Sequence, residues 1–335
     1  MEFAVARGVV KGERMNPKLQ PPNPKPQTLS YFYRMLSVTI LGNNSAVPAF
    51  NRHPTSQVVS HDGTNYLVDC GEGTQIQMIK YKIRRGKITH IFISHLHGDH
   101  YFGLIGLINS FSLLSHKQEL HVYAPEPLQQ IIEMQLKVAD NTISYPLHFH
   151  TLSGPAVLVD NEKIKISCFR TTHRIECYGF LFEEKEGKRK LLIDKVQKHE
   201  IPISFYSSLQ AGLDYITPKG VRIKNAELTA DPGAAKKYAF CADTKYDESI
   251  IPHIYGADAI YHETTYLDNM RDKAEERFHC TTKQAATIAL KAMVGKLLIG
   301  HFSSKYSVLD QFLEEAREIF PDTELALEGV TYNIY

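Results

Sequence analysis

The stretch that decides the fold is His95-Leu96-His97-Gly98-Asp99-His100 (HLHGDH), which places four strong metal ligands within six positions. The residues before it, 90–94, are β-branched and aromatic and predict a buried strand. Residues 102–114 carry apolar side chains at helical spacing. We therefore expect the ligands on a loop between a strand and a helix, where a rigid strand positions side chains that remain free to converge on an ion.

The composition of this loop indicates metal binding rather than simple solvation. Clustered imidazoles repel one another when protonated and gain nothing from their proximity without a cation. Imidazole and carboxylate ligands with no thiolate nearby favour zinc, manganese or iron over a structural zinc–cysteine site. His95 and His97 alternate and can face one ion, while Asp99 and His100 can turn towards another. The motif thus predicts two metals.

The composition of the 335-residue chain is that of an ordinary globular protein, with 43% hydrophobic and 22% charged residues. Its net charge of +1 gives no whole-surface attraction to nucleic acid or membrane, although local basic patches remain possible. An odd number of cysteines without a CxxC pair predicts reduced, mostly buried thiols in a cytoplasmic protein. No apolar run approaches the length of a membrane span.

Two segments differ from the rest of the chain. Residues 1–34 are rich in proline and basic residues, without the apolar run of a secretory signal, and predict a disordered N-terminal extension. Residues 183–236 are polar and turn-rich, which indicates an insertion or arm. We expect one domain over 35–335, with the arm at about 183–210.

Further ligand candidates follow predicted strands along the chain. His173 comes after the strand at 164–169, Asp243 after 237–242, and His301 after 297–300. A lone histidine in such a place is more often a core or surface residue, but beside HLHGDH it is a natural ligand, and an aspartate at a strand end can bridge two cations. Strands and helices alternate in both halves, which predicts a layered α/β protein with its site along one rim of the sheets.

Several motifs together carry a family resemblance. They are VDCGEGTQ at 68–75, HLHGDHYFGLIGL at 95–107, HRIECYGF at 173–180, ADT at 242–244, HETTY at 262–266, HCTTKQAATIA at 279–289 and IGHFSSKY at 299–306. From residue 36 to 335 the chain resembles the metallo-β-lactamase superfamily and, within it, the ribonuclease Z family of tRNA 3′-end endonucleases. The resemblance implies a four-layer αββα sandwich of the metallo-β-lactamase type with an inserted arm.

The same resemblance implies a site of two zinc ions, with manganese as an alternative. The implied ligands are His95, His97 and His173 for one ion, Asp99, His100 and His301 for the other, and Asp243 as the bridge between them. Asp99 would also orient or deprotonate the attacking water. His279, backed by Glu263, is the candidate acid for the leaving 3′-oxygen, although both residues could simply buttress the ligands.

The implied substrate is precursor tRNA, cleaved to leave a 3′-hydroxyl on the tRNA and a 5′-phosphate on the trailer. The implied assembly is a homodimer in which the arm of one subunit serves the site of the other, with no membrane partner. Candidate phosphate contacts, otherwise a solvated face, are Lys80, Lys82, Arg84, Arg85 and Lys87.

One departure concerns the arm, where Ile203-Ser204 stands in place of the family's Gly-Pro pair. The departure leaves open how the arm would grip tRNA. The alternatives are a hydrolase of small esters or thioesters on the same fold, and a non-catalytic RNA-binding protein on this scaffold.

Overall fold

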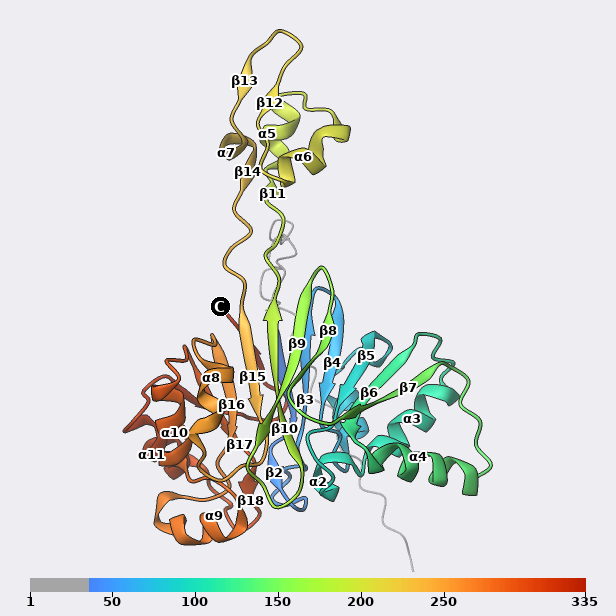
Figure 1. Cartoon of the computed structure of the whole chain (residues 1–335), viewed down its shortest axis with the longest axis vertical. Helices are drawn as coiled ribbons and strands as arrows, with labels where there is room; N and C mark the ends of the chain where they lie inside the picture. The colour runs from blue at the N-terminus through green and yellow to red at the C-terminus, as the bar shows by residue number, and fades with distance from the viewer. Residues whose placement is uncertain (1–35) are drawn as a thin grey trace, which may run out of the picture. The chain divides into compact units, whose positions relative to one another are not determined.

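The structure is a computed structural model that describes residues 36–335, which all belong to one structural unit. The expected extension at 1–34 lies outside the described residues. Two seven-stranded sheets form the centre of the unit (Figure 1). No helix in the described range is long and apolar enough to cross a membrane.

The first sheet is antiparallel at one side and parallel at the other. A short hairpin turn at Asp62-Gly63, both with positive φ, joins its third and fourth strands in sheet order, and Asp-Gly is a pair typical of such turns. The strands, in sheet order, are β20 (Thr331–Asn333), β1 (Ser37–Gly42), β3 (Ser56–His61), β4 (Thr64–Val68), β5 (Ile88–Phe92), β6 (Leu120–Pro125) and β7 (Leu147–Leu152).

The second sheet repeats this plan with the chain's second half. Four of its strands are parallel and the rest antiparallel. In sheet order they are β19 (Thr323–Leu325), β17 (Leu297–Gly300), β16 (Ala259–Glu263), β15 (Lys237–Cys241), β10 (Cys177–Glu184), β9 (Ile164–Thr171) and β8 (Ala156–Asp160). A parallel pair of two-residue strands, β2 (Asn44–Ser45) and β18 (Phe302–Ser303), joins the two halves of the chain.

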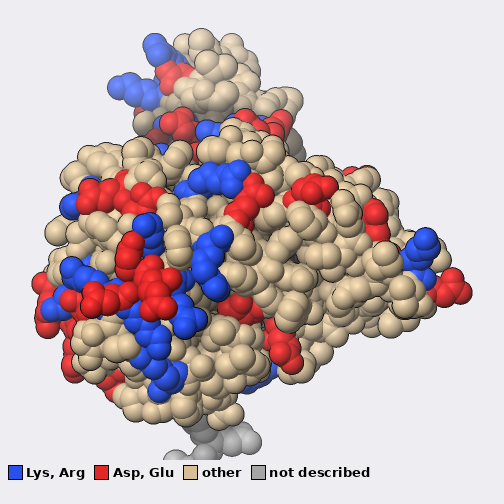
Figure 2. Space-filling view, turned by 60° about the horizontal axis from the view of Figure 1, so that its bottom comes forward, with Lys and Arg blue, Asp and Glu red and all other residues tan. Residues whose placement is uncertain are grey.

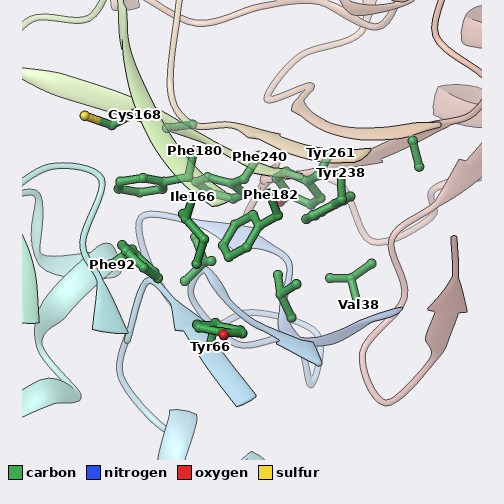
Figure 3. Packing of buried hydrophobic residues seen from close by; sticks show 14 of the residues in the cluster. Val38, Tyr66, Phe92, Ile166, Cys168, Phe180, Phe182, Tyr238, Phe240 and Tyr261 are labelled. Carbon is green, nitrogen blue, oxygen red and sulfur yellow. The ribbon is translucent and has the colours of Figure 1, made fainter. Parts of the chain in front are cut away.

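Aromatic side chains fill the space between the two sheets (Figure 3). Phe92 of β5 lies with its ring centroid 5.3 Å from that of Phe180 and 5.8 Å from that of Phe182, both on β10. Phe240 and Tyr261 stack at 5.2 Å on neighbouring strands of the second sheet. All five side chains are almost completely buried, so this aromatic layer holds the two sheets face to face.

Helices cover the outer face of each sheet. On the first sheet these are α1 (Thr74–Lys80), α3 (Leu104–Leu113) and α4 (Pro127–Val138), with Leu107 and Ile132 among their buried residues. On the second they are α8 (Ile251–Ile254), α10 (Thr282–Lys291) and α11 (Asp310–Arg317). The remaining helices of the sandwich are α2 (Gly98–Tyr101) and α9 (Arg271–Arg277), with 3₁₀ turns at Arg85–Lys87, Glu248–Ile250 and Asp268–Met270. The predicted αββα sandwich is confirmed.

Between β10 and β15 the chain forms an insertion with its own small apolar cluster, which includes Val196, Leu209 and Leu228. Asn225 supports it by donating from its amide to the carbonyls of Leu209 and Leu213 at 2.8 and 2.9 Å. Its elements are β11 (Lys190–Leu191), α5 (Ile193–Lys198), a 3₁₀ turn (Ile203–Phe205), α6 (Tyr206–Gln210), β12 (Tyr215–Ile216), β13 (Arg222–Ile223), α7 (Asn225–Leu228) and β14 (Thr229–Ala230). We call residues 185–236 the arm.

Candidate metal centre

The predicted ligands gather at one edge of the sandwich because they follow the carboxyl ends of their strands. His95, His97, Asp99 and His100 follow β5, and His301 directly follows β17. His173 and Asp243 each come two residues after a strand, β9 and β15. Carboxyl ends of parallel strands meet at a common edge, and this edge is where open α/β sheets bind ligands.

The loop at 69–73 interlocks with the HLHGDH loop. The Cys70 amide donates to the His100 carbonyl at 2.7 Å, and the Gly103 amide donates to the Cys70 carbonyl at 2.9 Å. A Cβ on Gly71 would lie 2.4 Å from the Asp99 carbonyl oxygen, so only glycine permits this approach. The VDCGEG motif therefore fixes the backbone that carries Asp99 and His100.

One group of ligand atoms is formed by His95, His97, His173 and Asp243. Nδ1 of His97 lies 3.0 Å from Nε2 of His95 and 3.1 Å from Nε2 of His173. Nitrogens that bind one tetrahedral zinc at 2.0–2.1 Å lie about 3.3 Å from each other. Oδ2 of Asp243 lies 3.7 Å from His95 Nε2 and 3.9 Å from His173 Nε2. The spacing of this group suits a single cation.

Asp99, His100 and His301 form another group, which meets the other oxygen of Asp243. Nε2 of His100 lies 3.5 Å from both Asp99 Oδ2 and Asp243 Oδ1. Nε2 of His301 lies 3.5 and 3.3 Å from the same two oxygens. Asp243 thus turns one carboxylate oxygen to each group, as a bridging ligand does.

Buried polar atoms in the cluster indicate that a cation belongs there. Nε2 of His100 and of His301 are buried and find no hydrogen-bond partner within the described range. Such buried atoms without a partner cost free energy unless a bound group satisfies them. Burial lowers the pKa of His95 and His173, and lowers that of His97 to about 4, so these imidazoles are in the neutral form that ligates metals. The donor set therefore fits divalent cations.

Asp69 orients His100 from behind. Its carboxylate is fully buried and accepts from the Ser94 amide at 2.8 Å, from the Ser94 hydroxyl at 2.9 Å and from Nδ1 of His100 at 2.7 Å. This contact places the imidazole proton on Nδ1 and leaves Nε2 free to ligate. Asp69 itself has φ 54, in the left-handed region that a non-glycine residue rarely adopts.

Glu263 plays a corresponding part for the second half of the site. Its carboxylate accepts from His279 Nδ1 at 2.8 Å, and from the Thr265 hydroxyl and amide at 2.8 and 2.9 Å. Because the Thr265 hydroxyl donates to Glu263, it accepts from Nδ1 of His301 at 2.9 Å. One buried carboxylate therefore positions both His279 and a predicted metal ligand.

His279 lies beside the ligand groups without belonging to the HLHGDH loop. Its ring centroid is 5.2 Å from that of His173 and 5.5 Å from that of His301, and its side chain is 13% exposed. Burial alone would lower its pKa, but the Glu263 carboxylate, with Asp243 and Asp99, raises the pKa of His279 to about 9. The raised pKa indicates that His279 carries a proton at neutral pH, while its ring also lies close enough to Asp243 and His301 to form a further group of possible ligand atoms with them.

These observations can be set against known proteins. A family model described as Anti-Pycsar protein Apyc1 matches residues 36–205. "Ribonuclease Z" of Bacteroides thetaiotaomicron is 40% identical over 300 residues, which are 88% of this chain and 95% of that one. "Ribonuclease Z" of Porphyromonas gingivalis is 40% identical over 300 residues, with 89% and 99% coverage. The chain belongs to the ribonuclease Z family.

Solved structures agree with ribonuclease Z membership. Human tRNase Z, short form, aligns with a TM-score of 0.66 and 26% identity over 89% of this chain and 99% of that chain. The metallo-β-lactamase fold protein YhfI of Bacillus subtilis aligns with a TM-score of 0.64, and at 19% identity it supports the fold alone. The family resemblance predicted from the motifs is confirmed.

The predicted basic run is divided by the fold. Arg84, Arg85 and Lys87 flank the amino end of β5, whereas the predicted ligands of the HLHGDH loop follow the carboxyl end of the same strand. Lys82 lies in the same connection, after α1. Lys80 lines a cavity of about 570 Å³ together with residues 48–53.

The loop that lines this cavity is connected to the predicted ligands, because the amide of Ala46, just before residues 48–53, donates to Asp99 at 2.7 Å. Over the face that carries α2 and α9, Figure 2 shows basic and acidic side chains interleaved on the α9–α11 side rather than one basic field. Within the basic run, Lys80 shares its cavity with this loop, whereas Arg85 lines a different cavity with residues 114–118.

Sequence reasoning missed the supporting residues Asp69, Ser94 and Thr265. In the sequence, Asp69 stands where a turn begins, between Val68 and Gly71. Thr265 belongs to the HETTY motif, in which no role was assigned to its hydroxyl. The position of Asp69 could have indicated its role, because Asp69 directly follows β4 just as the predicted ligands follow their strands. The prediction of reduced, buried thiols is borne out, since all five cysteines are free and buried.

Proposed function

We propose that the protein is a metal-dependent endoribonuclease that removes 3′ trailers from precursor tRNA. The observation that carries the proposal is the pair of ligand groups that share Asp243, with the Glu263–His279 pair beside them. The relatives named Ribonuclease Z, and the similarity to human tRNase Z, support tRNA as the substrate. A phosphodiester reaction also suits a site built to hold two cations.

The residues that would hold two zinc ions, or manganese in their place, are His95, His97 and His173 for one, Asp99, His100 and His301 for the other, and Asp243 for both. When bound, two such ions lower the pKa of water and stabilise the attacking and leaving oxygens of an in-line displacement. Asp69 and Glu263 hold the ligand imidazoles in the tautomer that this binding requires.

The chain's own residues supply the proton transfers. A carboxylate oxygen of Asp99 accepts the proton of the water that attacks the phosphorus after the mature 3′ end. His279, charged when its Nδ1 donates to Glu263, gives a proton to the leaving 3′-oxygen. The products are tRNA with a 3′-hydroxyl and a trailer with a 5′-phosphate, so water adds across one P–O bond.

The arm supplies candidate tRNA contacts away from the metals. It carries exposed Lys195 and Lys198 on α5. Arg222 of β13 and the nearby Lys224 line a cavity of about 470 Å³ elsewhere on the arm. In a homodimer in the cytoplasm, the arm of one subunit would serve the tRNA bound at the other subunit's site. Arg84, Arg85 and Lys87 would contact the substrate away from the cleaved bond, and Lys80 near it.

The substrate class can be tested by incubating the metal-loaded protein with 3′-extended precursor tRNA and, in parallel, with small chromogenic esters and thioesters. We expect cleavage of the RNA, its loss with chelator and its recovery with Zn²⁺ or Mn²⁺. Turnover of the small esters with intact RNA would favour the alternative hydrolase. RNA binding without cleavage in the presence of either metal would favour a non-catalytic role.

A further inference from the structure

A row of histidines lies away from the metal centre, on the inner face of the first sheet. Along β7 the sequence alternates as Leu147-His148-Phe149-His150, so the two imidazoles point to the same face. On β6, Leu120 and Val122 pack under the outer helices, which turns His121 to the inner face. Strand register pairs His121 with His148 and Tyr123 with His150. Three imidazoles therefore form a triangle on neighbouring strands.

This part of the inner face lies at the margin of the second sheet. The edge strand of that sheet, β8, reaches Tyr123, whose hydroxyl donates to the Leu158 carbonyl at 3.0 Å. The first sheet continues past this contact to β7. There His148 is exposed, and His121 and His150 are half-buried, so the row is open to solvent on one side.

One pair in the row, His121 and His150, has the nitrogen spacing of metal ligands. Nδ1 of His121 lies 3.0 Å from Nε2 of His150, the same separation as between His95 and His97 in the metal centre. The His148 and His121 ring centroids are 5.0 Å apart, and Nε2 of His121 lies 3.6 Å from the Glu119 carboxylate. Because exposed side chains change rotamer readily, His148 can bring a third nitrogen to the pair.

The protonation of the row also suits a cation. Burial lowers the pKa of His121 and of His150, and the neighbouring imidazoles lower both further, with Glu119 opposing at His121. Burial and the same neighbours lower the pKa of His90, at the inner end of the row, to about 4. Neutral imidazoles present lone pairs, the form in which histidine binds metal.

We propose that His121, His148 and His150 form an additional metal site for a borderline divalent cation of the zinc class, separate from the seven-ligand centre. Imidazole ligands suit Zn²⁺, Ni²⁺ and Cu²⁺, whereas Mg²⁺ and Ca²⁺ require oxygen ligands. The bound ion would join β6 to the edge strand β7. The site does not depend on the substrate or on the catalytic step.

The test is the number of metal ions bound per chain. Wild type, the double variant His148→Gln/His150→Gln and a control, His253→Gln at the exposed histidine of α8, are each equilibrated with Zn²⁺ and analysed for metal. We expect the double variant to bind one Zn²⁺ fewer than wild type, with the control unchanged and tRNA cleavage retained. Equal Zn²⁺ content in wild type and the double variant would overturn the proposal.

If the double variant folds poorly, the single variant His148→Gln tests the same proposal. His148 is exposed, so its replacement leaves the packing intact. We expect isothermal titration with Zn²⁺ or Ni²⁺ to show at least tenfold weaker binding at the additional site, while the remaining sites are unaffected. An unchanged titration would show that the 3.0 Å contact is only a hydrogen bond between His121 and His150.

Discussion

Replacing Asp69 by asparagine changes the metal centre without removing any ligand. One oxygen of Asp69 accepts from both His100 Nδ1 and the Ser94 hydroxyl, at 2.7 and 2.9 Å. In the variant an amide NH₂ takes the place of one oxygen. If the NH₂ group faces His100, it meets the N–H on Nδ1 and two donors oppose each other. The imidazole can avoid this only by moving its proton to Nε2, the atom that must bind the ion. If it faces the Ser94 amide instead, two donors meet there.

The size of the effect follows from this one contact. A hydrogen bond to a charged group is worth about 1.5–3 kcal/mol. A factor of ten in affinity corresponds to about 1.4 kcal/mol, so the loss predicts about 10- to 100-fold weaker metal binding. Loss of such outer partners lowers metal affinity or activity by about the same 10- to 100-fold in known sites.

Metal affinity of the Asp69→Asn variant is best measured by competition with a chromogenic chelator. The matched control is Asp272→Asn, an exposed aspartate on α9. We expect the variant to lose one ion at chelator concentrations that leave wild type and control loaded, and tRNA cleavage to fall in parallel. Wild-type metal affinity together with wild-type cleavage would refute the argument that Asp69 sets the His100 tautomer.

Three other changes test separate parts of the site. His279→Ala should lower kcat for precursor tRNA by about 10²- to 10⁴-fold with the metal content unchanged; loss of an ion would make His279 a ligand instead. Asp99→Ala should abolish cleavage and release metal, and near-normal turnover would contradict the two-metal site. Lys195→Ala/Lys198→Ala on the arm should flatten the salt dependence of tRNA binding by about one to two units of the log–log slope. The control is Lys137→Ala, at an exposed lysine of α4. An unchanged salt dependence in the arm variant would show that the arm lysines are solvated and do not contact tRNA.

The sequence predicts best where one local pattern decides the outcome. The helix α4, Pro127–Val138, is of this kind, because a proline opens it and its apolar residues keep helical spacing. The helix expected at 102–114 begins at Leu104 instead, after the separate α2. A Cβ on Gly103 would lie 2.2 Å from the Gly71 carbonyl oxygen, so this break depends on a contact that a single segment does not reveal.

Features that depend on distant parts of the chain were harder to predict. The sequence of the arm is polar and turn-rich, yet Val196 and Leu228, 32 positions apart, share its small core. The strand β8 was not predicted, since its residues are half-exposed at a sheet edge. In the site, the motifs indicated which residues converge, but Asp69 and Thr265 act through hydrogen bonds that only the folded chain shows.

The central claim is tested most directly by mapping the ends that the metal-loaded protein produces from a 3′-extended precursor tRNA. The account predicts one cut directly after the mature 3′ end, leaving a 3′-hydroxyl on the tRNA and a 5′-phosphate on the trailer, and no cut when chelator is present. Cleavage that leaves a 2′,3′-cyclic phosphate, or cleavage that persists without metal, would contradict it.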